Sequence, residues 1–212
     1  MGNLRFEVTT DVSNVVTEVA GALAELNNTS AVNLVSLASP YPDLRVTGLA
    51  IAPPSGWSAG QSVTVSWTVN NSGDAAADAP WSDGILVRNL STGQTLVNAS
   101  QAHSADVEGA LAAGGTRTRS FTFTWPQGTA GVGQMEFTVT TDISGDVFES
   151  NAQDDAEANN VQRVTVASTP DLTVRNVRIE QGAVQAGDNI TVRWEDVNGG
   201  VATTPAGWND RI

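Results

Sequence analysis

Short segments that alternate apolar and polar residues run through the middle of the chain. Val63 to Val69 alternates at every position, and Arg119 to Trp125 does the same until Pro126 ends it. A period of two is typical of a strand with one face buried and the other in water. No segment shows the apolar stripe of a long amphipathic helix. The pattern therefore predicts an all-β chain built from short strands.

Turn residues separate these segments. Ser91 to Gly93 lies between Ile85–Val87 and Thr95–Val97, which is the arrangement of a β-hairpin. Further strands are predicted at Leu44 to Ile51, Met135 to Thr140 and Val161 to Val166. About seven short antiparallel strands with turns between them are typical of an immunoglobulin-like β-sandwich, and we expect that fold here.

The pattern also repeats at a spacing of about 130 residues. Phe6 to Asp11 returns as Phe137 to Asp142, and Pro42 to Leu44 returns as Pro170 to Leu172. Domain-sized copies at a fixed spacing indicate a tandem array rather than a solenoid of small repeats. The phase predicts three pieces: the end of a preceding unit over residues 1–38, one complete unit over residues 43–167, and the start of a following unit over residues 171–212.

Composition narrows what the chain can bind. Its 23 acidic residues outnumber its 10 basic residues, all of them Arg, and give a net charge of −13. This charge argues against binding nucleic acid or an anionic membrane, and it suits the binding of cations. The chain has no Cys, no Lys and one His, so thiol chemistry and most catalytic bases are excluded. No stretch has the length of a membrane span, and we expect any export signal to lie outside this chain.

Four motifs follow one another in the complete unit. They are Pro42 to Leu44 at its start, Ala59 and Gly60 before an alternating strand, Val69 to Gly73 in a turn, and Asp142 through Glu157 to Asn160 at its end. In this order they resemble the CARDB family, the cell adhesion related domain found in bacteria. The resemblance implies an immunoglobulin-like domain that occurs in tandem in large bacterial and archaeal extracellular proteins, where it serves adhesion or spacing without a defined ligand.

One segment concentrates acidic side chains. Six carboxylates and no basic residue lie between Asp142 and Glu157. Like charges in a short loop repel one another, and a bound cation relieves that repulsion. Oxygen ligands favour calcium, and we predict Asp142, Asp146, Glu149 and Glu157 as its ligands. The other interpretation is a structural turn in which the carboxylate of Asp142 accepts backbone N–H groups of its own loop.

The tryptophans raise an alternative, because exposed indoles can stack on sugar rings. Trp67 lies in phase with Val65 and Val69, so we expect it in the core. Trp57 lies in a turn and is the strongest candidate for an exposed aromatic side chain. A row of such aromatics on one sheet face would indicate carbohydrate binding.

We therefore predict a non-catalytic structural or adhesive repeat module of a large extracellular or cell-surface bacterial protein. It acts as a spacer, stiffened by calcium and by two short joints that contain proline, Ala38 to Pro42 and Ala167 to Pro170. Its expected partners are neighbouring repeats and a cell-surface or matrix glycan or protein. Two alternatives stay open: a carbohydrate-binding accessory module of a secreted enzyme, and the subunit of a filament that assembles head to tail through partial repeats.

Overall fold

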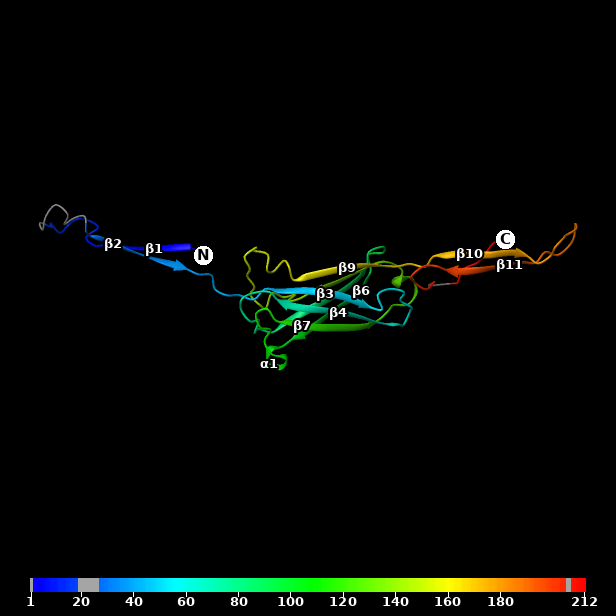
Figure 1. Ribbon diagram of the computed structural model, residues 1–212, viewed down its shortest axis with the longest axis horizontal. Helices are drawn as coiled ribbons and strands as arrows, with labels where there is room; N and C mark the ends of the chain where they lie inside the picture. The colour runs from blue at the N-terminus through cyan, green and yellow to red at the C-terminus, as the bar shows by residue number, and fades with distance from the viewer. Residues whose placement is uncertain (1, 19–26, 205–206) are drawn as a thin grey trace. The chain divides into compact units, whose positions relative to one another are not determined.

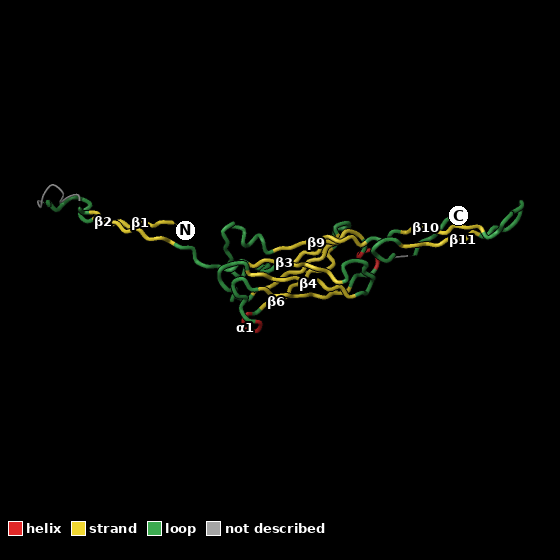
Figure 2. The backbone as a smooth tube through the Cα atoms, viewed as in Figure 1, coloured by secondary structure: helices red, strands yellow, loops and turns green. Residues whose placement is uncertain are grey.

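The computed structural model describes residues 2–18, 27–204 and 207–212 (Figure 1). Its regular structure is almost entirely β-strand (Figure 2). Residues 1–40 form one unit and residues 41–212 form another. The predictions for residues 1–38 and 171–212 fall partly outside the described residues.

Seven strands of the second unit form a sandwich. They are β3 (Leu44–Ala52), β4 (Ser62–Asn71), β5 (Trp81–Asn89), β6 (Thr95–His103), β7 (Thr116–Thr124), β8 (Gly133–Thr140) and β9 (Val161–Ser168). Antiparallel pairing arranges them in two sheets, β3-β4-β7 and β6-β5-β8-β9. The only helices among the described residues are the single turns α1 (Ala105–Glu108) and η2 (Gly128–Gly131). The predicted all-β, immunoglobulin-like sandwich is therefore confirmed.

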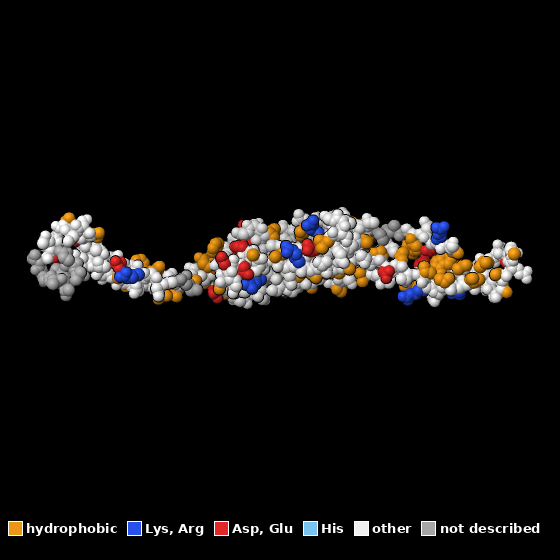
Figure 3. All heavy atoms as spheres, turned by 90° about the horizontal axis from the view of Figure 1, so that it is seen from above, with side chains coloured by type: hydrophobic (Ala, Val, Ile, Leu, Met, Phe, Trp, Pro, Cys, Tyr) orange, Lys and Arg blue, Asp and Glu red, His pale blue; other side chains and the backbone are white. Residues whose placement is uncertain are grey.

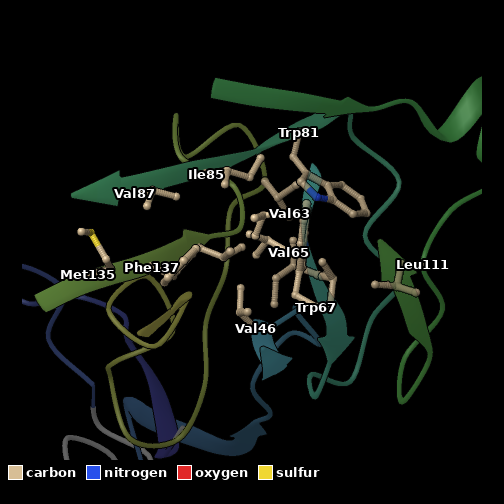
Figure 4. Close-up of a cluster of buried hydrophobic side chains, with 14 of the residues drawn as sticks. Val46, Val63, Val65, Trp67, Trp81, Ile85, Val87, Leu111, Met135 and Phe137 are labelled. Atoms are coloured by element: carbon tan, nitrogen blue, oxygen red, sulfur yellow. The ribbon is translucent and has the colours of Figure 1, made fainter. Parts of the chain in front are cut away.

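Alternation within the strands builds the core between the two sheets (Figure 4). In β4 every second residue is buried. The buried apolar side chains of β4 are Val63, Val65, Trp67 and Val69, and those facing them from β5 and β8 include Ile85, Val87, Met135, Phe137 and Val139. Full burial of such a side chain contributes about 1.5–3 kcal/mol, so this layer supplies most of the stabilisation of the fold. The predicted core position of Trp67 is confirmed.

Trp57 is buried, and the prediction that it is exposed was wrong. Its side chain is 1% exposed, and its ring lies 4.4 Å from the ring of Trp125 and 5.4 Å from that of Phe137. Its Nε1–H donates to the carbonyl oxygen of Pro53 at 2.7 Å. That hydrogen bond satisfies the only polar atom of the indole, so the turn can place the whole ring in the core.

Two further hairpins complete the described strands: β1 (Gly2–Thr9) with β2 (Thr29–Ser36), and β10 (Leu172–Ile179) with β11 (Val192–Asn198). The first has the register of β8 and β9. Phe6 lies opposite Val32, and in the sandwich Phe137 lies opposite Val164 in the same way. The sequence repeat is thus matched by a repeat in strand pairing.

The second hairpin has the register of β3 and β4. Both pairs carry a bulge at the same place, where Gly48 has a φ of 62° and Asn176 a φ of 54°. Both end in a turn that only glycine fits. A Cβ on Gly73 would lie 2.3 Å from the carbonyl oxygen of Tyr41, and one on Gly200 would lie 2.4 Å from that of Thr169.

Candidate metal centre

The candidate ligands lie in the loop between β8 and β9, residues 141–160, which contains no helix or strand. Asp142 begins this loop with a φ of 45°, a left-handed conformation that Asp tolerates because its short side chain bonds locally. Its two carboxylate oxygens accept the backbone N–H groups of Asp146 and Val147, each at 2.9 Å. The structural turn that we offered as the second interpretation is therefore present.

The N-terminal unit contains the same turn. Asp11 also has a φ of 45°, and its carboxylate accepts the N–H groups of Val15 and Val16 at 2.9 Å each. The turn forms there with Val15 in the place of Asp146. The conformation of this aspartate therefore depends on the local hydrogen bonds rather than on a bound ion.

Glu149 is the most constrained carboxylate of the loop. Its side chain is buried, with one oxygen accepting the N–H of Leu44 and the other accepting the side-chain amide of Asn160 at 2.9 Å. The pKa of Glu149 is raised from 4.5 to about 7, chiefly by burial and also by the charges of Glu157 and Asp142, against the opposing effect of the hydrogen bonds from Leu44 and Asn160. A carboxylate held in this way is stabilised by a proton or by a cation.

Three of the four predicted ligands come together. Asp142, Glu149 and Glu157 each place one carboxylate oxygen so that the three atoms lie within 4.8 Å of one another. Asp146 does not join this group: its side chain is exposed, and its backbone N–H bonds to Asp142. Burial raises the pKa of Asp142 as well, against its two backbone hydrogen bonds. The three carboxylates thus gather negative charge at a place that is partly shielded from water.

Asn160 adds a fourth oxygen that the sequence analysis did not select. Its side chain is 3% exposed, and its amide nitrogen donates to Glu149. Its Oδ1 has no hydrogen-bond partner among the described residues. Oδ1 and Nδ2 of Asn160 are bonded to the same carbon atom, and Nδ2 donates to Glu149. The unpartnered Oδ1 therefore lies near the Glu149 carboxylate. Carboxylate and amide oxygens together are the donor set that calcium takes.

The loop is fastened to the segment that enters the sandwich, chiefly through Asp43. This side chain is 2% exposed. Its carboxylate accepts hydrogen bonds from Arg45, Ser72, Asn151 and Asn159. Burial alone would raise the pKa of Asp43, but these hydrogen bonds outweigh it and hold the pKa below 3.8. The ionised side chain therefore joins the entering segment to the β3–β4 sheet and to the loop.

Backbone groups of the entering segment bond to the loop as well. The N–H of Leu44 donates to Glu149, and the carbonyl of Pro42 accepts the N–H of Ser150 at 3.2 Å. The rings of Tyr41 and Phe148 meet edge to face, 5.1 Å apart. The loop that gathers the carboxylates thus also holds residues 41–44 in place, and Glu149 takes part in both arrangements.

The CARDB family matches residues 41–164, which span both the sandwich and this loop. The chain belongs to the CARDB family. CARDB is a bacterial, adhesion-related domain and is generally non-catalytic. No curated protein matches the chain.

Comparison with solved structures finds CARDB domains and parts of larger enzymes that are similar to this chain. A crystal structure of a CARDB domain from Pyrococcus furiosus, described as a complex with di-metal ions, is 20% identical, with a TM-score of 0.42, and the match covers 63% of this chain and 93% of that one. A solution structure of the same domain is 19% identical, with a TM-score of 0.42, and the match covers 62% and 98%. A β-glucosidase 3B from Thermotoga neapolitana is 13% identical, with a TM-score of 0.36, over 59% of this chain and 16% of the enzyme.

The part of the CARDB chain that the structure describes contains no helix long and apolar enough to cross a membrane.

A buried charge cluster inside the CARDB sandwich was missed by the sequence analysis. Asp83 is fully buried and accepts the indole N–H groups of Trp67 at 2.9 Å and Trp81 at 3.1 Å. It also accepts the hydroxyl of Thr141 at 2.8 Å and lies 3.2 Å from Nε of Arg119. A sequence signal existed: Trp81 and Asp83 recur as Trp208 and Asp210. In the second copy Asp210 accepts the indole N–H of Trp194 at 3.2 Å.

His103, the only histidine of the chain, lies beside this cluster. It is 1% exposed, its ring centroid lies 3.6 Å from that of Trp81, and its Nδ1 lies 2.7 Å from the carboxylate of Glu108. Its Nε2 has no partner among the described residues. Burial and the charge of Arg117 lower the pKa of His103, although Glu108 opposes them. The folded domain therefore favours the neutral ring, with its proton on Nδ1.

We expect the substitution His103→Phe to weaken the acid sensitivity of the domain. Because the pKa of His103 in the folded state lies below 6.5, the unfolded chain takes up a proton that the folded chain excludes. The stability that this exclusion contributes is fully present above pH 6.5. It is lost as the pH falls through the pKa of His103 in the folded state. Phe keeps an aromatic ring beside Trp81 and cannot titrate. Thermal unfolding from about pH 7.5 to pH 5 measures the loss for both proteins, and equal losses would contradict the prediction.

Proposed function

We propose that this chain is a non-catalytic, adhesion-related spacer module of an extracellular or cell-surface bacterial protein, and that calcium binds in its 141–160 loop. The proposal rests on the observation that this one loop makes two sets of contacts. It gathers the carboxylates of Asp142, Glu149 and Glu157, and it grips residues 42–44 through backbone and side-chain hydrogen bonds. A cation held by these carboxylates stabilises the hydrogen bonds between the loop and residues 42–44. It thereby stiffens the segment through which the chain enters the sandwich.

Electrostatics favours a cation at this place. Three carboxylate oxygens within 4.8 Å of one another repel, and Glu149 is already driven toward its protonated form. A bound cation would remove both the repulsion between the carboxylates and the free-energy cost of keeping Glu149 ionised. The unpartnered Oδ1 of Asn160, on a side chain that is almost fully buried, supplies an uncharged ligand next to them.

The donor set favours calcium over magnesium. Calcium accepts six to eight oxygens in a flexible arrangement, whereas magnesium demands near-ideal octahedral geometry and keeps its waters. Asp142 is fixed by its own turn, Glu149 is fixed by Leu44 and Asn160, and Glu157 is exposed. Such a mixture of buried and exposed carboxylates, completed by water, suits the larger ion.

The spacer role rests on the joints and on the repeats. The hairpin registers and turns copied from the sandwich support a tandem array, with residues 1–38 and 171–212 as parts of neighbouring units. Each predicted joint contains proline, which restricts bending. A net charge of −13 keeps such an array soluble and extended outside the cell, where a glycan or protein could be its partner.

Calorimetric titration of the chelator-treated chain with calcium tests the proposal. Wild type should bind calcium, with no comparable heat from magnesium, and Glu157→Gln should lose about tenfold or more in affinity because one charged ligand is gone. Glu157 is exposed, so this change spares the core. The matched control is Glu136→Gln, the same change on β8 outside the loop. Absence of calcium binding, or an equal loss in the control, would refute the site.

Amide hydrogen exchange in the same samples tests the stiffening separately. Calcium should slow exchange of the Leu44 and Ser150 amides in wild type and in Glu136→Gln, because the hydrogen bonds that these amides donate between the entering segment and the loop open less often. Calcium binding without slower exchange would leave a metal site that does not stiffen the joint.

A further inference from the structure

A groove of about 510 Å³ opens on the outer face of the β6-β5-β8-β9 sheet. It lies over Gly84 of β5, which pairs with Ser100 of β6 on one side and with Thr140 of β8 on the other. Because glycine has no side chain, the sheet is hollow at this point. A Cβ at Gly84 would lie 2.7 Å from Cγ2 of Ile143, another residue that lines the groove. The volume lies in the range of small-ligand sites, about 300–1,000 Å³.

Hydrogen-bonding side chains line this groove without partners in the chain. They are Asn98 and Ser100 of β6 and Thr138 and Thr140 of β8, and none of these side chains makes a hydrogen bond to the described residues. Thr138 is only 7% exposed. Polar groups that leave water need hydrogen-bond partners, so these hydroxyl and amide groups are available to a bound molecule.

The charge that lines the groove differs from the charge of the whole chain. The net charge is −13, yet the described residues that line the groove include Arg163 of β9 and no carboxylate. Elsewhere on the sandwich, acidic and basic side chains are interspersed (Figure 3). Arg163 is exposed and has no hydrogen bond or ion pair with the described residues. An unpaired guanidinium binds a carboxylate through two parallel hydrogen bonds.

Two aliphatic side chains, Leu86 and Ile143, also line the groove, and Ile143 is 47% exposed. A sugar ring presents hydroxyl groups around its edge and C–H groups on its faces, so it matches a site that combines polar groups with aliphatic carbon. A peptide fits less well. The central strands β5 and β8 are each paired on both sides, so they offer no free backbone edge to a peptide strand.

We propose that this groove binds a glycan through one sugar that carries a carboxylate, such as a uronic acid. Arg163 binds the carboxylate, the side chains of Asn98, Ser100 and Thr140 bind the sugar hydroxyls, and Ile143 packs against the ring. The net charge of −13 repels a polyanion, so the ligand is a single acidic sugar on an otherwise neutral glycan. This site rests on the proposed adhesive function, whose glycan partner it specifies, and it does not require calcium.

Titration of the 212-residue chain with methyl glucuronoside, followed through amide chemical shifts in NMR spectra, tests the site. The amide signals of Gly84, Ser100 and Thr140 should shift and saturate. Methyl glucoside has the same ring without the carboxylate, and it should bind about tenfold or more weakly, because the charged hydrogen bonds to Arg163 are absent.

Arg163→Gln should reduce the affinity for methyl glucuronoside by about tenfold or more and leave the affinity for methyl glucoside nearly unchanged. The matched control is Arg88→Gln, the same change at an exposed arginine of β5 that does not line the groove. It should bind like wild type. Ser100→Phe places a large side chain in the groove from an exposed position of β6 and should abolish binding of both sugars.

Three results would overturn the site: wild type that does not bind methyl glucuronoside, equal affinity for the two glycosides, or an equal loss of affinity in Arg163→Gln and Arg88→Gln. Thermal unfolding of each variant shows whether the sandwich is intact. Calcium titration of Arg163→Gln separates the two proposals. Calcium binding that persists without sugar binding would keep the metal site and reject the groove, and sugar binding without calcium binding would do the reverse.

Discussion

Replacing Asp83 with Asn is expected to destabilise the CARDB sandwich by about 3–5 kcal/mol, a large share of the stability of an ordinary domain. The change removes the charge opposite Arg119, whose side chain is 4% exposed, and leaves the guanidinium buried without compensation. It also replaces one of the two carboxylate oxygens with an amide nitrogen, so the indole N–H of either Trp67 or Trp81 faces a donor in place of its acceptor. Denaturant unfolding followed by tryptophan fluorescence measures the effect.

Asp210→Asn is the matched control, because Asp210 accepts the indole of Trp194 in the same motif but is exposed. Its cost should be about 0.5 kcal/mol or less. The double variant Asp83→Asn with Arg119→Met should recover part of the loss, because the unpaired charge is then gone. A cost below about 1 kcal/mol for Asp83→Asn alone would show that the cluster contributes little to stability.

Replacing Glu149 with Gln is expected to have opposite effects with and without calcium. In chelator, the pKa of Glu149 near 7 means that folding favours its protonated form. This contribution to stability is full below pH 4.5 and is lost as the pH rises through 7. At about pH 8 the neutral Gln avoids that loss, so the variant should be the more stable protein. Rotation of the Asn160 amide, whose oxygen has no partner, lets it accept from the new side chain.

Calcium should reverse the order. At a hundred times its dissociation constant it stabilises wild type by about 2.7 kcal/mol, which is several degrees in unfolding temperature for a domain of this size. The variant lacks the central ligand and should gain little. Thermal unfolding at about pH 5 and pH 8, in chelator and in calcium, gives the four conditions needed. If the two proteins keep the same order at pH 8 in both solutions, Glu149 is not a ligand.

Period-two alternation was sufficient to predict the strands and the core, because neighbouring residues of a strand point to opposite faces whatever they pack against. Val63 to Val69 illustrates this, since every second side chain is buried. Trp57 could not be placed in this way. It lies in a turn, and only contact with Trp125 and Phe137, which are distant in sequence, draws it inside.

The sequence predicted the chemistry of the candidate site but not all of the residues that form it. The density of carboxylates and the turn at Asp142 follow from local sequence, and the structure contains both. Whether a given side chain points inward depends on the path of the loop. That path leaves Asp146 exposed and brings Asn160 beside Glu149. The motif that contains Asp43 was found, but its role was missed for the same reason, since its partners Asn151 and Asn159 come from the other end of the domain.

The separation between Asp43 and Asn159 has a consequence during synthesis. Their hydrogen bond joins residues 116 positions apart, so the entering segment cannot be fastened to the loop until nearly all of the domain has left the ribosome. Until then Asp43 is held only by residues nearby in the chain, such as Asn71 and Ser72. The bonds from Asn151 and Asn159 thus join the two ends of the sandwich, and folding of the domain is complete only when both residues are in place.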